Sequence, residues 1–372
     1  MEIPNLIFTV LFSCGVLFGI SFIWYTRFYK NRKDRTTNYL TWLLVAFTLN
    51  NIQILWVDNF VSPNNCFLKN LHPFLFFVFV VPYFHAFILG YLKIENKFIK
   101  YTNFAKIIFA VGMTARIVLS PFFKIGNCRI IGQYVQAEEI AIAILSTIVF
   151  IQVIRIIFFK KDLFKDLLSY DKLKWINQFL ILGAIVLVFW IIAIIFNFKN
   201  YVNAQFYVYY PLRMSSSVLL YWVAYTGSFR NVLTSDRENI RKKLVSNPKT
   251  ILVETKVETE SSIKFKSICD FLEKTECFLN PDISLEQLSE KINIKRTNLS
   301  DEINKNAKQN FNDFVNSFRV SKAKLLLKDP DYENYTIDAI GLECGFNSKS
   351  TFYNAFKKST NTTPAVYRQI IF

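Results

Sequence analysis

Seven long stretches with few or no charged side chains constrain the fold more than any other feature of this sequence. Four of them carry no charge, and the other three carry one arginine each. Since a bilayer core needs about 20 apolar residues per helix, each stretch is long enough to cross it. The alternative, buried helices of a soluble core, predicts shorter and more amphipathic segments. We therefore expect residues 1–230 to form a seven-helix transmembrane domain, with helices at 3–26, 36–57, 70–92, 107–123, 141–159, 175–198 and 207–229.

The basic residues predict how this bundle is oriented. Residues 1–230 hold 22 Lys and Arg against 9 Asp and Glu, a net charge of +13. Counted to residue 243, the loops on one side of the predicted membrane carry 19 Lys and Arg, and those on the other side carry 4. Because such residues collect on the cytoplasmic side, we expect the N-terminus outside and the C-terminus inside. The prediction is a multi-pass protein of the cell inner (cytoplasmic) membrane, with membrane lipid as a partner.

Four charged side chains lie near the outer ends of predicted membrane helices. Arg116 and Arg213 each lie about two helical turns inside such an end, and Glu138 and Glu139 open the fifth helix on the same side. Charges inside a membrane are costly and are often functional. These four could line an outward-facing sensor pocket for a charged ligand. The alternative is that they pair with one another and hold the bundle together.

The cysteines give a second hint about the outer side. Cys66 and Cys128 fall in two outer loops, where an oxidising environment permits a disulfide between them. Two free thiols remain the alternative. Cys269, Cys277 and Cys344 lack the CxxC spacing of a zinc site, so we expect no metal.

Enzyme signatures are missing from the sequence. The two histidines, His72 and His85, both lie in the membrane half, so no cytoplasmic histidine can accept a phosphoryl group. There is no glycine-rich phosphate loop and no HExxH motif. We expect neither enzymatic activity nor a cofactor.

The character of the chain changes after residue 230. Residues 231–262 are polar and mixed in charge, and Pro248 interrupts them. We expect a short juxtamembrane helix followed by a flexible linker. Residues 263–372 then carry a net charge of only +2, and amphipathic patterns replace the long apolar runs. A separate cytoplasmic domain is predicted there.

Residues 283–304 have the pattern of a helix, a turn and a second helix. Ser284 and Gln287 have the spacing of a capping box at the start of the first helix. Leu299 and Ile303 would form the inner face of the second helix. Near the start of that second helix, the side chains expected to face outward are Arg296, Thr297, Ser300 and Asp301.

The pattern returns after a long amphipathic helix that we expect to run from Phe311 to Lys328, before Pro330. Thr336 would cap the next helix, and Gly345 suits a left-handed turn. Asn347 or Ser348 would cap a second outward-facing helix. Thr363 and Pro364 would then start a final short helix. The outward positions of the second unit are Lys349, Ser350, Tyr353 and Asn354.

Two helix-turn-helix units joined by one long helix resemble the AraC/XylS-type DNA-binding domain. The fragment GFNSKSTFYNAFKKSTNTTPAVYR is similar to that family's signature nearly end to end, and the resemblance covers roughly residues 265–372. It is carried by Leu285, Leu288, Leu299, Phe314, Arg319, Ala323, Leu326, Ile340, Gly345, Phe346, Ser348, Phe352, Phe356, Lys357, Pro364, Tyr367 and Arg368.

The resemblance implies that both outward-facing helices enter adjacent major-groove segments on one face of double-stranded DNA. Positions that match the family's base-reading positions are Thr297, Ser300, Asp301, Lys349, Ser350, Thr351, Tyr353 and Asn354. Side chains better suited to phosphates are Arg296, Lys305, Lys357, Lys358 and Arg368.

The sequence departs from the family pattern at several positions. Lys308 and Asn361 replace glycines expected after each recognition helix, and Gly341 stands where a small alanine is usual. Asp301 and Glu302 put acid on the first recognition helix, where phosphates would repel it. We expect weak nonspecific affinity for DNA.

Together these features predict an all-α, membrane-bound, sequence-specific transcription regulator. An unknown ligand or partner protein would be sensed through the membrane domain. Homodimerisation would help, because two tethered domains raise each other's effective concentration. The alternative is a membrane transporter or receptor whose helix-turn-helix tail contacts protein rather than DNA. Scarce glycine and the lack of an internal repeat argue against a transporter.

Overall fold

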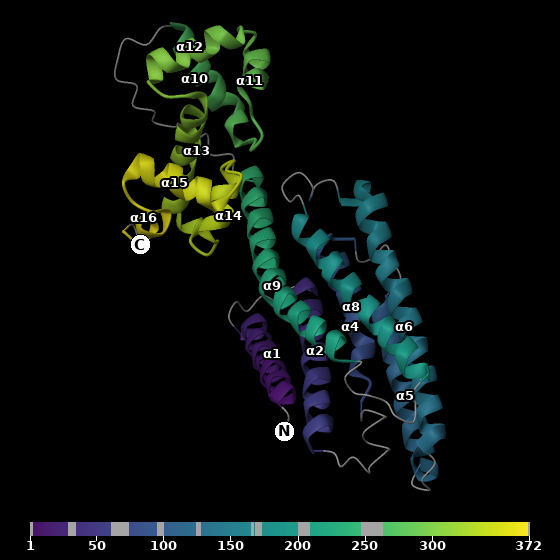
Figure 1. The fold of residues 1–372 in the computed structure, drawn as a ribbon. Helices are drawn as coiled ribbons and strands as arrows, with labels where there is room; N and C mark the ends of the chain where they lie inside the picture. The colour runs from purple at the N-terminus through teal and green to yellow at the C-terminus, as the bar shows by residue number, and fades with distance from the viewer. Residues whose placement is uncertain are drawn as a thin grey trace. The chain divides into compact units, whose positions relative to one another are not determined.

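The computed structural model describes residues 3–28, 35–60, 74–94, 100–123, 128–164, 167, 173–199, 209–246 and 263–370. Within these residues every regular element is a helix (Figure 1). The chain divides into two compact units, an N-terminal unit of residues 1–231 and a C-terminal unit of residues 232–372. An all-α fold is therefore confirmed for the part of the chain that is described.

The N-terminal unit has a helix at each of the seven apolar stretches. The third stretch begins with a short 3₁₀ turn, η1, before α4. The helices are α1 (Ile3–Phe28), α2 (Arg35–Phe60), η1 (Phe76–Phe79), α4 (Val80–Tyr91), α5 (Tyr101–Phe123), α6 (Cys128–Phe159), η3 (Lys161–Phe164), α8 (Lys174–Lys199) and the first part of α9 (Tyr210–Ser246).

Apolar side chains lie on both the inside and the outside of this unit. Phe84 and Phe179 pack in its core with ring centroids 4.2 Å apart. Leu17, Ile117 and Ile195 are nevertheless more than half exposed. By length and composition, three of the described helices could cross a membrane, at Arg35–Val57, Gln136–Phe159 and Lys174–Phe196. Seven crossings stay a prediction.

The C-terminal unit is built around α13 (Phe311–Lys328), which runs between two small helical clusters (Figure 1). Phe314 and Phe318 of α13 enter the core of the first cluster, and Val320 and Leu326 enter the core of the second. The other elements are α10 (Ile263–Thr275), η6 (Cys277–Leu279), α11 (Leu285–Ile292), α12 (Arg296–Ala307), η7 (Pro330–Tyr332), α14 (Ile337–Glu343), α15 (Lys349–Thr360) and α16 (Pro364–Gln369).

Local signals explain where α13 begins and ends. The Asn310 side chain accepts a hydrogen bond from the backbone N–H of Asp313 at 2.9 Å, which caps the helix. Asp329 has an extended backbone, as expected for the residue before a proline, and Pro330 follows it. The predicted span of this helix, Phe311 to Lys328, is confirmed.

The segment after residue 230 differs from the prediction in one respect. A short juxtamembrane helix was expected from residue 231, and the helix found there is the last part of α9, which runs without a break from Tyr210 to Ser246. The predicted linker, residues 247–262, lies outside the described residues. So do Cys66 and the side chain of Cys128, so the predicted disulfide is not tested.

Candidate nucleic-acid interface

The first helix-turn-helix consists of α11 and α12. The predicted capping box is present: Ser284 Oγ accepts from the Gln287 N–H at 3.2 Å, and the Ser284 N–H donates to Gln287 Oε1 at 3.3 Å. Asn293 ends α11 in a left-handed conformation, with φ of 56°. Leu299 and Ile303 are buried, as the sequence predicts. These contacts fix which face of α12 points outward.

The outward face of α12 carries the predicted polar side chains. Arg296, Thr297 and Asp301 are exposed, and Ser300 is partly exposed. Arg296 Nη1 lies 2.7 Å from Oε1 of Glu286 on α11. The first residue of this recognition helix is thus an arginine held by a carboxylate of the preceding helix.

The second helix-turn-helix consists of α14 and α15 and follows the same plan. Thr336 accepts from the Ala339 N–H at 3.3 Å and caps α14. Gly345 has a φ of +93°, which L residues with a side chain rarely adopt. Of the two residues predicted as alternative caps of α15, Ser348 is the cap, because its hydroxyl accepts from the Thr351 N–H at 3.2 Å.

The outward face of α15 offers both charge and hydrogen-bonding groups. Lys349, Ser350, Thr351 and Asn354 are exposed. Tyr353 is partly buried, and burial is the main cause that raises the pKa of its phenol above the ordinary value. Its hydroxyl therefore keeps its proton at neutral pH and can donate a hydrogen bond.

Lys349 repeats the arrangement of Arg296 in the second unit. Its Nζ lies 3.0 Å from Oδ2 of Asp338 on α14 and 5.3 Å from the centre of the Tyr353 ring. Each recognition helix therefore begins with a cation that pairs with an acid at the second residue of the preceding helix. This pairing was not predicted, although both acids are visible in the sequence. It orients the two cations and offsets part of their charge.

Arg319 joins the two helix-turn-helix units. Its side chain is 7% exposed, and its guanidinium donates from Nε to the carbonyl of Phe278 at 2.7 Å and from Nη2 to that of Asn280 at 2.8 Å. The guanidinium also lies 5.8 Å from the centre of the Phe346 ring in the second unit. A Cβ on Gly345 would come within 2.6 Å of the Phe278 carbonyl oxygen, so glycine is needed here for space as well as for conformation.

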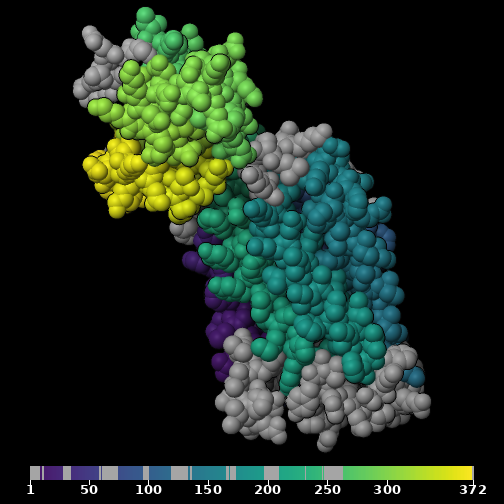
Figure 2. All heavy atoms as spheres, turned by 45° about the horizontal axis from the view of Figure 1, so that its top comes forward, coloured from purple at the N-terminus to yellow at the C-terminus, as the bar shows by residue number. Residues whose placement is uncertain are grey.

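The two helix-turn-helix units also touch at their surfaces. Asn347 Nδ2 donates to the carbonyl of Pro281 at 2.9 Å. Lys358 of α15 pairs with Asp313 at the start of α13 at 2.9 Å. In Figure 2 the green atoms of the first helix-turn-helix unit and the yellow atoms of the second helix-turn-helix unit form one continuous surface. The spacing of the recognition helices is therefore set by packing as well as by α13.

The departures from the family pattern have structural explanations. Lys308 and Asn361 both end their helices in left-handed conformations, with φ of 52° and 58°. A Cβ on Gly341 would lie 2.3 Å from Cδ1 of the buried Phe352, so the usual alanine would not fit beside this ring.

The predicted phosphate ligands of the second unit differ in their surroundings. Lys357 is exposed on α15. Arg368 is partly buried, and its Nη1 donates to the carbonyls of Tyr335 at 2.8 Å and Glu333 at 3.3 Å. Arg368 therefore ties α16 to the segment before α14. Its contact with a phosphate stays a prediction.

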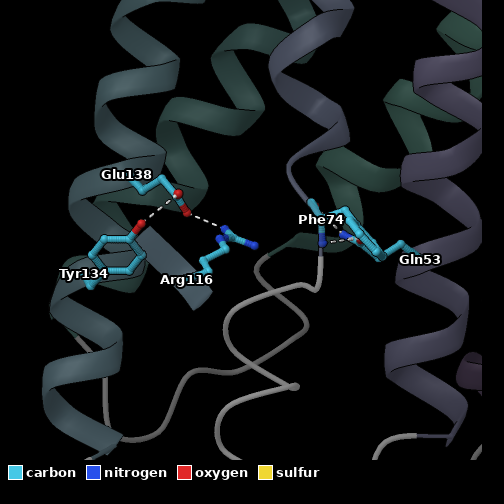
Figure 3. A network of polar contacts seen from close by, with 5 residues as sticks. All are labelled: Gln53, Phe74, Arg116, Tyr134 and Glu138. Atoms are coloured by element: carbon cyan, nitrogen blue, oxygen red, sulfur yellow. Dashed lines mark hydrogen bonds and ion pairs between the residues drawn. The ribbon is translucent and has the colours of Figure 1, made fainter. Parts of the chain in front are cut away.

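Two of the four charges predicted for a membrane pocket form a pair. Arg116 on α5 pairs with Glu138 on α6, and Tyr134 donates to the same carboxylate at 3.3 Å (Figure 3). Glu139 has different partners, since Trp190 Nε1 and the Tyr209 hydroxyl each donate to it at 3.1 Å.

Arg213 is buried in α9. On α2, the Gln53 side chain makes two hydrogen bonds with the backbone of Phe74, at 2.8 and 2.9 Å (Figure 3). Polar groups thus link several helices of this unit. No group of three or more His, Cys, Asp or Glu side chains that could hold a metal ion occurs among the described residues.

The C-terminal unit is similar in sequence to known regulators. A sequence model described as a helix-turn-helix domain matches residues 288–370. An uncharacterized HTH-type transcriptional regulator of Staphylococcus aureus (strain COL) is 34% identical over 105 residues, which are 28% of this chain and 13% of that protein. The xylose operon regulatory protein of Escherichia coli (strain K12) is 28% identical over 88 residues, which are 24% of this chain and 22% of that protein.

Two solved structures each align with less than a third of the chain. The C-terminal domain of AraT, a response regulator from Geobacillus stearothermophilus, is 24% identical, covers 30% of this chain and 88% of its own, and has a TM-score of 0.26. A Listeria innocua protein is 30% identical, covers 29% of this chain and 98% of its own, and has a TM-score of 0.25. The sequence model that matches residues 288–370, together with the relatives named as regulators, confirms the predicted AraC-type helix-turn-helix domain in that part of the chain.

Proposed function

We propose that this protein is a membrane-held transcription regulator that binds specific sequences of double-stranded DNA. The observation that carries the proposal is the pair of helix-turn-helix units with polar, exposed recognition helices. A recognition helix presents its N-terminal residues to base edges in the major groove. Both α12 and α15 expose polar and charged side chains at that end.

In this proposal both recognition helices read bases, through different sets of side chains. In the second unit, base edges are read by Lys349, Ser350, Thr351, Tyr353 and Asn354, whose donors and acceptors suit more than one base. In the first unit, Thr297 and Ser300 read bases, Asp301 accepts from a cytosine amino group, and Arg296 contacts a phosphate. Lys357 and Arg368 contact phosphates in the second unit.

Low charge makes self-association part of the proposal. Residues 263–372 carry a net charge of only +2, and Glu286 and Asp338 offset two of the cations proposed to contact DNA, Arg296 and Lys349. A domain with so little net positive charge releases few counterions from DNA, so its nonspecific binding should be weak. A homodimer held in a membrane would present two such domains at high effective concentration.

The N-terminal unit, in this proposal, crosses the membrane seven times with its N-terminus outside and senses a ligand or partner protein there. Three helices with the length and apolarity of membrane spans support it, as do the exposed apolar side chains. The charged residues at the outer ends of helices, Arg116, Glu138, Glu139 and Arg213, are the groups we assign to that sensing. Ligand binding would compete with the Arg116–Glu138 pair.

The test is a selection of genomic DNA fragments by the full-length protein in lipid nanodiscs, at a stated salt concentration. The proposal expects enrichment of one sequence motif, and expects the double variant Arg296→Ala and Lys349→Ala to lose it. A folded wild-type protein that enriches no motif would refute DNA reading. That result would favour the alternative in which the helix-turn-helix tail contacts protein.

A further inference from the structure

The cytoplasmic half of α9, residues 232–246, belongs to the core of the second helix-turn-helix. Leu233 and Ile240 are 7% and 0% exposed. They lie in one hydrophobic cluster with Leu326 of α13 and Ile340 of α14. Without this helix, part of the apolar face of α14 would be open to water.

Charged side chains of α9 also hold both ends of α14. At its C-terminal end, the buried carboxylate of Glu343 accepts from Arg237 Nε at one oxygen and from Arg241 Nε at the other, each at 2.6 Å. At its N-terminal end, Oδ2 of the fully buried Asp236 accepts from the backbone N–H of Thr336 at 3.0 Å. We call these four side chains and the Thr336 amide the α9 clamp.

A third contact extends the clamp toward the turn before α14. Lys243 Nζ donates to the carbonyl of Asp331 at 2.6 Å. The same ammonium lies 5.5 Å and 5.2 Å from the ring centres of Tyr332 and Tyr335. The contacts of α9 therefore include the turn before α14 as well as both ends of α14.

The position of α14 in turn sets that of α15. Gly341 of α14 packs directly against the ring of Phe352, and Asp338 of α14 holds Lys349 at the start of α15. A displacement of α14 therefore moves both the recognition helix and one of its DNA-reading cations.

The Glu343 side chain is only 4% exposed, so the loss of its two arginine partners is costly. A buried carboxylate that loses its partners pays a large desolvation cost, so partial separation is unfavourable. The α9 clamp is either closed or opened to water. Since α9 is one continuous helix from Tyr210 to Ser246, it enters the C-terminal unit directly from the predicted seventh membrane segment.

We propose that the α9 clamp is a regulatory device: closed, it holds α14 and α15 in the DNA-binding arrangement, and opening it switches the second helix-turn-helix off. This rests on the proposed DNA-binding function. A signal in the N-terminal unit would then act by moving α9, and not through the linker of residues 247–262.

The test compares Glu343→Gln with Glu333→Gln in the full-length protein in lipid nanodiscs. Glu333 is exposed, so its substitution makes the same charge change outside the clamp. Glu343→Gln should make the backbone amides of Thr336 and α14 exchange hydrogen about a hundredfold faster. It should also weaken binding to a wild-type-enriched DNA fragment by about tenfold or more. Amides of α12 should keep their protection in both variants.

Each other outcome overturns the proposal. Unchanged exchange in α14 would show that the clamp holds nothing. Faster exchange with unchanged DNA affinity would show that the clamp does not act on reading, and tighter binding would show that the closed clamp inhibits. If Glu343→Gln unfolds the second helix-turn-helix unit, the comparison is repeated with Arg241→Gln, which is a smaller perturbation. Its control is Lys242→Gln, at the exposed neighbouring residue. If the wild type enriches no DNA, the proposed function fails, while the exchange comparison still tests the clamp.

Discussion

Replacing Arg319 by methionine should destabilise the C-terminal unit. Methionine has a similar length but cannot donate to the carbonyls of Phe278 and Asn280. Burial lowers the pKa of Arg319 to about 10, so the guanidinium is still charged at neutral pH and both hydrogen bonds are charge-assisted. Such bonds contribute about 1.5–3 kcal/mol each. Phe278 is 1% exposed, so its carbonyl stays without a partner, whereas Asn280 is exposed and water can replace the lost donor.

The expected loss in the free energy of unfolding is therefore about 2–4 kcal/mol, less than two full bonds. With a urea dependence of about 1–3 kcal/mol per molar, the unfolding midpoint of residues 232–372 should fall by about 1–2 M. Circular dichroism during urea titration measures this. Arg296→Met is the matched control, because that side chain is 63% exposed and its loss should cost less than about 0.5 kcal/mol. Equal midpoints for the two variants would refute the reasoning.

Three further predictions concern the C-terminal unit. Gly341→Ala should destabilise it by about 1–3 kcal/mol in urea titrations, because the Phe352 ring must move; an unchanged midpoint would contradict this. Burial raises the pKa of the Cys269 thiol from 9.0 to about 12, with Glu273 and Asp270 adding to it. The folded thiol keeps its proton where the unfolded one ionises, so stability should fall as the pH rises above about 9, and less so in Cys269→Ala. In gel-shift assays, Lys349→Ala should weaken binding to an enriched DNA fragment by about 1–3 kcal/mol. The variant should also discriminate less than the wild type against base changes in one half-element of that fragment, and equally well against changes in the other.

Local features of the C-terminal unit were predictable because their signals act within one helical turn. Ser284 with Gln287, Thr336, and Thr363 with Pro364 each cap the helix that follows, as the sequence indicated. Such caps depend on residues three or four positions apart. The sequence therefore placed both helix-turn-helix units and the exposed side chains of their recognition helices.

Contacts between distant segments were not predictable in the same way. Arg237 and Glu343 are 106 residues apart, and a single sequence does not say which of many charges will meet. Glu138 and Glu139 show the same limit within one helix. Neighbouring residues on a helix point about 100° apart, so the two carboxylates have different partners.

The continuity of α9 was also missed. The sequence changes from apolar to polar near position 230, yet residues 231–246 contain no proline or glycine that would break a helix. Leu233 and Ile240 continue an apolar stripe on one side of the helix. That stripe was the signal from which the docking of α9 on α14 could have been inferred.

The most direct test of DNA reading by two units is a chemical footprint of the full-length protein on the fragment that it enriches. We expect two protected major-groove segments about one helical turn apart on the same face of the DNA, since α13 spans about 27 Å between the two helix-turn-helix units. Lys349→Ala should remove protection from one segment only, and Arg296→Ala from the other. A single protected segment, or two on opposite faces, would contradict the account.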